Sequence, residues 1–153
     1  FRQFEADVYR WIVRIIRDRS AADDVLVEAF WRAYRGRAGF DPTRSFGAWM
    51  RRIASNAALD HLRAARSRAG WRTADDRIPS APPPDRAIEE SITQAFRSLP
   101  PRLQIVATLA LVEEQPYAEI AEALDLPVGT IKSRVFRATR LLRKELARLG
   151  ITP

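Results

Sequence analysis

The sequence predicts an all-α protein made of two small helical domains joined by a flexible linker. Apolar residues recur at three- and four-residue spacing along most of the 153-residue chain, which is the pattern of helices with one buried face. No stretch shows the alternation of a half-buried strand. Residues 70–85 lack periodicity and contain three consecutive prolines, which favour an extended spacer. We therefore expect helical blocks at 1–69 and 86–153.

Three helices are predicted in the first block. The first covers residues 4–17, and its apolar face consists of Phe4, Val8, Trp11, Ile12, Ile15 and Ile16. Ser20 is the expected N-cap of the second helix, with Asp23 completing a capping box. This helix reaches residue 35 and buries Val25, Leu26, Ala29, Phe30 and Ala33. Two glycines and an Asp-Pro pair indicate a loop at 36–44. The third helix, at 45–68, has as its expected inner face Phe46, Trp49, Met50, Ile53, Ala57 and Leu62.

The second block begins with two further helices. Asp85 is the expected cap of a helix at 86–98, and Pro101 is suited to the first position of a helix at 101–112. Residues 117–143 then form a short helix, a tight turn and a longer basic helix. Pro127 ends the short helix, because proline disfavours the helical conformation in the residue before it.

The longer helix has two different faces at about 100° per residue. Its apolar stripe consists of Ile131, Val135, Ala138, Leu142, Leu146 and Leu149. The opposite side carries Lys132, Ser133, Phe136, Arg137 and Arg140. A core hairpin of any α-helical protein would also show the apolar stripe. However, residues 127–148 are strongly basic, whereas residues 113–125 are acidic and contain no Lys or Arg. This contrast favours a helix-turn-helix whose second helix enters the DNA major groove.

The composition limits the classes of function. A net charge of +7 favours a polyanionic partner, because phosphate contacts release counterions. The absence of Cys excludes disulfides and thiolate metal sites. No apolar run reaches the ~18 residues of a membrane span and no signal peptide is visible, so we expect a cytoplasmic protein without membrane insertion.

The sequence offers no enzymatic site. His61 is the sole histidine and has no cluster of carboxylates near it in sequence, so neither a triad nor a metal site can be assembled. No Gly-rich phosphate loop is present. We expect no catalytic residue, metal, cofactor or small-molecule substrate.

Two separated segments resemble one known family. Residues 21–63 contain an acidic aromatic helix, a loop and a helix similar to the family's W-L-x-x-I-A-x-N-x-x-x-D-x-x-R pattern, here Trp49, Met50, Ile53, Ala54, Asn56, Asp60 and Arg63. Residues 99–146 are similar to its promoter-reading region, with the G-T-x-K/R-S-R run at 129–134. The chain thus resembles the extracytoplasmic-function (group IV) sigma factors of bacterial RNA polymerase. Val27 is a departure, since the family often has Gln there.

The resemblance implies a function and a division of the chain. An alternative sigma factor binds core RNA polymerase through the β′ clamp and the β subunit, directs it to −10 and −35 promoter elements and assists opening. An anti-sigma factor is expected to hold it inactive. Residues 1–69 would form sigma region 2, 70–85 the linker and 86–153 sigma region 4.

The resemblance also implies three sets of binding residues. The −35 set consists of Thr130, Lys132, Ser133, Arg134, Phe136, Arg137 and Arg140. The −10 set consists of Phe40, Arg44, Phe46, Asn56, Arg63, Arg66 and Arg68. The polymerase-binding set consists of Asp24, Glu28, Phe30 and Arg32.

Each set has a structural alternative. Thr130 can serve simply in the first turn of its helix, Asn56 can hydrogen-bond within the bundle, and the aromatic residues of the −10 set can belong to the core. The charged residues of the polymerase-binding set can form local ion pairs on a solvated surface. Two other classes of protein also remain open. An autonomous helix-turn-helix regulator would bind specific duplex DNA alone, and a protein–protein adaptor would show no salt-dependent DNA binding.

Overall fold

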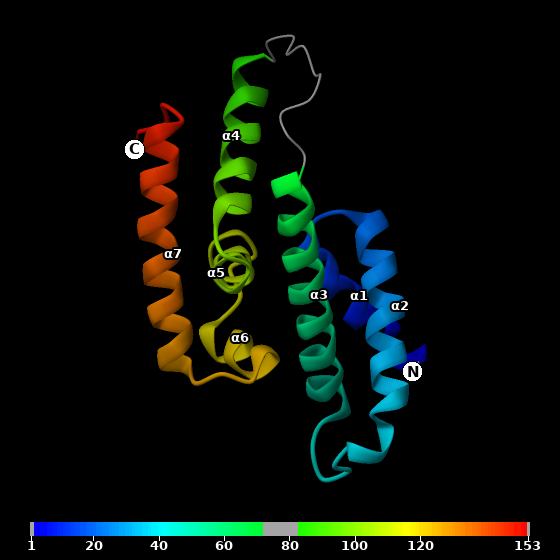
Figure 1. The fold of residues 1–153 in the computed structure, drawn as a ribbon. Helices are drawn as coiled ribbons and strands as arrows, with labels where there is room; N and C mark the ends of the chain where they lie inside the picture. The colour runs from blue at the N-terminus through cyan, green and yellow to red at the C-terminus, as the bar shows by residue number, and fades with distance from the viewer. Residues whose placement is uncertain (1, 72–82, 153) are drawn as a thin grey trace.

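The computed structural model describes residues 2–71 and 83–152, which contain helices and no strand (Figure 1). The predicted all-α class is confirmed. In chain order the elements are α1 (Arg2–Ile16), α2 (Arg19–Arg35), the 3₁₀ turn η1 (Arg37–Gly39), α3 (Phe46–Trp71), α4 (Pro84–Ser98), α5 (Pro101–Ala107), the π-helical turn η2 (Thr108–Val112), α6 (Tyr117–Leu124) and α7 (Val128–Arg148). No helix within the described ranges is long and apolar enough to cross a membrane.

The first block is a bundle in which α1, α2 and α3 each contact the other two. The buried residues of its core are Val8, Trp11, Ile12, Ile15, Ala22, Val25, Ala29, Ala33, Met50, Ala54, Ala57, Ala58 and Leu62. Many of them are alanines, and small side chains at a contact allow helix axes to approach closely. Ser55 is also buried and accepts a hydrogen bond of 2.9 Å from the Trp11 indole Nε1. The polar edge of the largest core side chain is therefore paired.

The ends of several helices differ from the prediction. The N-cap of α2 is Asp18 rather than Ser20, because its carboxylate accepts from the amides of Ser20 (3.0 Å) and Ala21 (3.3 Å). A carboxylate at this position also interacts favourably with the helix dipole. Pro84 is the first residue of α4, so Asp85 lies in the first turn instead of capping the helix. Proline is tolerated there because its missing amide would be unpaired in any case.

These boundaries shorten the predicted linker of residues 70–85 at both ends. The helix α3 continues to Trp71, beyond the predicted end at residue 68, and α4 begins at Pro84. Residues 72–82, the centre of the predicted linker, lie outside the described residues.

The second block is built around α7, which contacts α4, α5 and α6. One of its apolar clusters contains Ala95, Leu99, Leu103, Ala107, Ala138 and Leu142. The predicted helix at 101–112 is present, but its last part is the wider π-turn η2, in which the Glu113 amide donates to the Thr108 carbonyl at 3.0 Å.

The helix-turn-helix has a well-defined turn. Asp125 follows α6 in the left-handed conformation, with φ of 54°. The Leu126 amide bonds the Ala121 carbonyl at 3.0 Å, and the Asp125 amide bonds the Glu122 carbonyl at 3.3 Å. This pair of bonds is the Schellman motif that ends many helices. Pro127 then precedes α7 directly. The turn therefore depends on Asp125 as well as on the predicted effect of the proline.

The two blocks pack against each other, which the sequence did not predict. The helix α3 contacts α5 and α6, and α1 contacts η2 (Figure 1). The larger apolar cluster is shared, since it joins the core of α1–α3 to buried residues of the second block, namely Ile105, Val106, Leu109, Ile120, Ala121, Ala123, Ile131 and Val135. Ion pairs Arg17–Glu113 and Arg52–Asp125 also join the blocks.

Candidate nucleic-acid and polymerase interfaces

The helix α7 exposes the face that was predicted to meet DNA. Lys132, Ser133, Phe136, Arg137 and Arg140 are all exposed, and Phe136 is 67% exposed. The buried residues of the helix are Ile131, Val135, Ala138 and Leu142, as the apolar stripe predicted. An aromatic side chain left in water between basic residues is unusual for a purely structural helix. This face is thus available to a nucleic acid.

Two members of the −35 set are partly covered. Thr130 is half-buried in the first turn of α7, and its carbonyl accepts a bond of 3.0 Å from the Ser133 hydroxyl. Arg134 is half-buried as well, and its pKa is lowered, first by burial and then by the charge of Arg102 on α5. Within the described part of the chain, neither arginine has a carboxylate partner. A phosphate would relieve the repulsion between these two cations.

Arg102 was missed by the sequence reasoning. Its position in the first turn of α5, directly after two prolines, is a signal for a structural helix start and not for a ligand contact. Only the contact between α5 and α7 brings it near Arg134.

The loop between α2 and α3 borders a cavity of about 580 Å³. Its lining consists of Gly39, Phe40, Asp41, Arg44, Ser45, Ala48, Trp49, Arg52 and, from α6, Glu122. Phe40 and Trp49 are half-buried, with ring centroids 5.0 Å apart. The cavity therefore offers aromatic surface and guanidinium groups together, a combination that suits an unstacked base and its phosphates.

Phe46 has a different setting from Phe40 and Trp49. It does not line the cavity. Its ring contacts Phe4 (4.9 Å between centroids), Phe40 (5.5 Å) and Trp49 (5.6 Å). These contacts fit the structural alternative for Phe46, which supports the two lining rings from behind.

Asp41 organises the loop. Its Oδ1 accepts from the Thr43 hydroxyl at 2.7 Å and from the Thr43 amide at 2.9 Å. The hydroxyl bond is the main reason that the pKa of Asp41 lies below its ordinary value, with the amide bond and Arg44 adding to the effect. An Asx turn of this kind fixes the backbone before α3 begins.

The loop should consequently respond to acid. Because the pKa of Asp41 is lower in the folded loop than its ordinary 3.8, the carboxylate stabilises the loop above that pH and loses this effect as the pH falls through the folded value. We expect the Thr43 amide resonance in NMR spectra to titrate with a midpoint below 3.8. The Asp41→Asn variant should show no such titration. A midpoint at or above 3.8 would contradict the assigned bonds.

The rest of the −10 set lies along α3. Asn56 is exposed, and within the described ranges its amide has no hydrogen-bond partner, so the alternative of a bond within the bundle is not observed. Arg66 and Arg68 are exposed too. Arg63 differs, because it donates to Asp60 at 3.3 Å.

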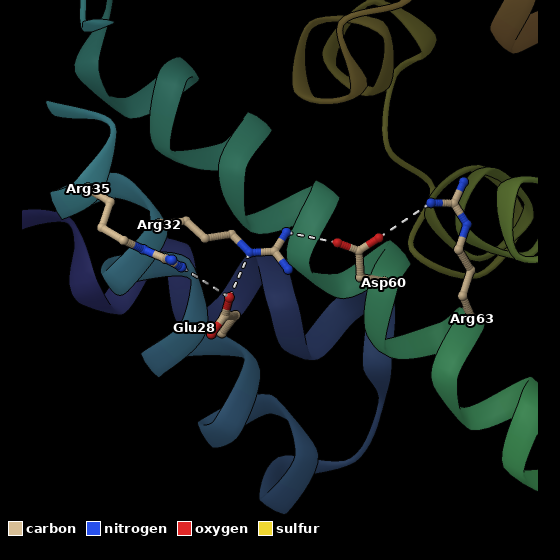
Figure 2. Close-up of polar contacts among 5 residues, drawn as sticks. All are labelled: Glu28, Arg32, Arg35, Asp60 and Arg63. Carbon is tan, nitrogen blue, oxygen red and sulfur yellow. Dashed lines mark hydrogen bonds and ion pairs between the residues drawn. The ribbon is translucent and has the colours of Figure 1, made fainter. Parts of the chain in front are cut away.

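A chain of ion pairs links α2 to α3 (Figure 2). Arg32 donates 2.9 Å bonds to Glu28 on its own helix and to Asp60 on α3. Arg35 lies 3.8 Å from Glu28, and Arg63 bonds the other oxygen of Asp60. The bond to Glu28 is the main cause that raises the pKa of Arg32, and Asp60 adds to it. Two members of the polymerase-binding set, Glu28 and Arg32, thus also help to hold the bundle together.

The same helix exposes an apolar surface that sequence reasoning missed. Val27, Trp31 and Tyr34 are 70%, 54% and 49% exposed, and with Leu26 and Phe30 they border a hollow of about 530 Å³ between α1 and α2. The signal was present in the sequence, since these three residues recur at helical spacing on a side of α2 away from its buried alanines. Asp24 is exposed on this helix. Large apolar side chains gathered on a surface mark an interaction site.

The described residues contain no group of three His, Cys, Asp or Glu side chains that could hold a metal ion. His61 is half-buried in α3.

Comparison with known proteins agrees with this arrangement of basic and apolar surfaces. Residues 1–68 match the family model of sigma-70 region 2, and residues 89–142 match that of sigma-70 region 4. The chain is 33% identical to the RNA polymerase sigma-H factor of Pseudomonas aeruginosa, over 94% of this chain and 82% of that protein. It is 30% identical to the ECF RNA polymerase sigma factor SigW of Bacillus subtilis, over 94% and 84% respectively.

Solved structures share the fold. The sigma factor CnrH, solved with the cytosolic domain of CnrY, aligns with a TM-score of 0.57 at 22% identity, over 95% of this chain and 84% of that one. RpoE of Bartonella quintana, solved with the anti-sigma factor NepR, aligns with a TM-score of 0.55 at 16% identity, over 95% and 92%.

The fold and its exposed basic faces define a DNA-binding initiation protein rather than an enzyme. The chain belongs to the extracytoplasmic-function sigma factors of RNA polymerase. Core RNA polymerase and promoter DNA are therefore its partners. This membership decides against the autonomous regulator and the adaptor.

Proposed function

We propose that this alternative sigma factor recognises the two promoter elements through separate surfaces of its two blocks. Residues 1–69 serve as region 2, which binds polymerase and the −10 element, and residues 86–153 serve as region 4, which binds the −35 element. The observation that carries this proposal is that each segment matched by a sigma-region model has its own exposed basic surface.

The −35 element is read by the exposed face of α7. Lys132 and Arg137 can donate to guanine O6 and N7, and Phe136 can contact a thymine methyl group. Ser133 lies on the same face. Arg140 is best suited to phosphate. Phosphate contacts position the protein on DNA without specifying a sequence.

Arg134 and Arg102 together are assigned to one backbone phosphate. Thr130, in the first turn of α7, lies where a helix N-terminus also favours an anion. The absence of a carboxylate partner for either arginine in the described residues supports this assignment.

Two substitutions on α7 should have different signatures. In holoenzyme, Arg137→Ala should cost about 1–3 kcal/mol at one −35 base pair and relax the preference there. Arg134→Ala should weaken all sequences alike and reduce the slope of log K against log salt by about 1. Binding measured on duplexes substituted at each −35 position, at several salt concentrations, separates the two outcomes. A uniform loss for Arg137→Ala would make that residue a phosphate contact.

The −10 strand is held by the loop cavity and α3. Phe40 offers a stacking surface in the cavity, with Phe46 behind it. Arg44 is suited to the strand's phosphates, and the Asn56 amide can pair with a base edge. Arg63, Arg66 and Arg68 continue the positive surface along α3, where counterion release favours binding.

Polymerase is bound by α2. Asp24 and Glu28 supply acidic groups, while Phe30 and the exposed Trp31 supply apolar area. Arg32 contributes mainly by fixing Glu28 in place through the bond at 2.9 Å. The β′ clamp is the expected partner of this helix, and β is expected to contact region 4.

Regulation and location follow from the same family. The solved structure of the RpoE sigma factor is a complex with an anti-sigma factor, and we infer that an anti-sigma factor controls this chain as well. It acts in the cytoplasm, where polymerase and promoter DNA are found.

Run-off transcription tests the whole proposal. Core polymerase with this protein, on a library of promoter sequences, should start at defined positions that share −35 and −10 motifs. Start sites identical to those of core polymerase alone would refute the proposal.

A further inference from the structure

The second block contributes acidic groups to the −10 surface of the first block. Glu122 of α6 lines the loop cavity together with Arg44 and Arg52. One turn further on, the Asp125 Oδ1 lies 3.2 Å from Arg52 Nη2. Both carboxylates belong to a segment, residues 113–125, that contains five acidic residues and no basic one. The acidity of this segment is unexplained by reading of the −35 element.

A carboxylate and a DNA phosphate compete for the same guanidinium group, because both offer oxygen acceptors with negative charge. While Asp125 pairs with Arg52, that arginine is not available to a phosphate. Glu122 in the cavity repels a phosphate that approaches Arg44 or Arg52. The arrangement therefore disfavours single-stranded DNA at the cavity.

We propose that α6 is an internal lid over the −10 cavity, closed in the free protein and displaced when polymerase separates the two blocks. This inference rests on the assignment of the cavity to the −10 strand. The lid is selective, since the −35 face of α7 remains exposed while α6 lies on α3. The free factor would thus be prevented from capturing single-stranded DNA away from polymerase.

The closed state is poised to open. Its apolar part is the shared cluster between the blocks. Against this, the Nε of Arg52 is buried without a hydrogen-bond partner, and a buried unpaired donor opposes the state that buries it. The Asp125 side chain is 68% exposed in its ion pair, and exposed pairs are weak. Separation of the blocks returns the Arg52 donor to water or to DNA.

The lid can be weakened by Glu122→Gln with Asp125→Asn. Asparagine tolerates the left-handed conformation that Asp125 adopts, so the turn before α7 is kept. The matched control is Glu114→Gln with Glu119→Gln, which removes the same charge from exposed residues that form no ion pair within the described chain. The probe is a short fluorescent oligodeoxythymidine, because stacking on aromatic side chains tolerates any base.

We expect the lid variant to bind this probe roughly fivefold more tightly than wild type, since apparent affinity rises with the open fraction. The control variant should change affinity less than twofold, on the order of a weak nonspecific charge effect. Equal affinities of the two variants would overturn the lid.

A distance measurement provides a second readout. The chain has no Cys, so spin labels can be placed at Ala64→Cys on α3 and Ala147→Cys on α7, both exposed positions. Wild type should give one narrow distance, and the lid variant and the polymerase complex a longer or broader one. An unchanged distance in the polymerase complex would refute displacement of the lid. Run-off transcription by the same proteins tests the proposed function separately, because failure to initiate leaves the oligonucleotide and distance results intact.

Discussion

Replacement of Trp11 by alanine should unfold the first block or bring it close to unfolding. The indole is 1% exposed at the centre of the α1–α3 bundle. Its Nε1 donates to Ser55, whose hydroxyl in turn donates to the Arg51 carbonyl at 2.7 Å, and the Arg51 guanidinium lies 5.2 Å from the ring centroid. Removal of a buried tryptophan costs about 3–5 kcal/mol, from lost burial and from the cavity left behind. That loss is a large part of a small domain's stability.

Urea unfolding followed by circular dichroism measures this effect. Trp11→Phe separates the contributions, because it keeps most of the ring but removes the indole N–H. We expect an intermediate loss for this variant, since the Ser55 hydroxyl retains its bond to the Arg51 carbonyl. A loss below about 1 kcal/mol for Trp11→Ala would contradict the position of the ring in the core.

Replacement of Trp31 by alanine should have the opposite profile. This side chain is 54% exposed and stacks on Tyr34 with ring centroids 5.9 Å apart. Truncation of an exposed residue changes stability by about 0.5 kcal/mol or less. If α2 docks polymerase, however, the ring becomes buried in the complex. An aromatic anchor of this kind contributes about 2 kcal/mol or more, which corresponds to roughly a 30-fold loss of affinity.

Affinity for core polymerase, measured with fluorescently labelled protein, tests the docking face. Ile88→Ala serves as a matched control, because Ile88 is 49% exposed on α4 of the other block. It should leave polymerase binding unchanged. Full affinity of the Trp31→Ala protein, with its fold intact, would show that polymerase binds elsewhere. The comparison of Trp11 with Trp31 also separates effects on folding from effects on docking, since the substitution is chemically the same.

The periodicity of the sequence was sufficient to predict the helices and most of their buried faces. Val8, Trp11, Ile12 and Ile15 are buried as expected, and so are Ile131, Val135, Ala138 and Leu142 of α7. The helical period alone specifies which side of a helix is apolar. The burial of Ala123 was not predicted, because the expected inner side of that short helix was the one facing α7. In the structure α6 contacts α3 as well as α7, so two sides of α6 are covered.

The helix ends were harder to predict. Asp18 and Ser20 are both suitable N-caps, and the choice depends on how the two-residue connection between α1 and α2 is closed. Arg17, which precedes the cap, takes a left-handed conformation with φ of 57°. Local sequence does not specify this conformation for an arginine.

By itself the sequence determined the helical class, the basic recognition face and the absence of cysteine chemistry, because periodicity, charge and composition are properties of the chain. Only the tertiary structure decided which charges are free. It pairs Arg32 with Asp60, leaves Asn56 unpaired and brings Arg102 near Arg134. It also places α6 against α3, so that Asp125 meets Arg52. These contacts join residues far apart in sequence, and their geometry follows from the packing of whole helices rather than from any local pattern.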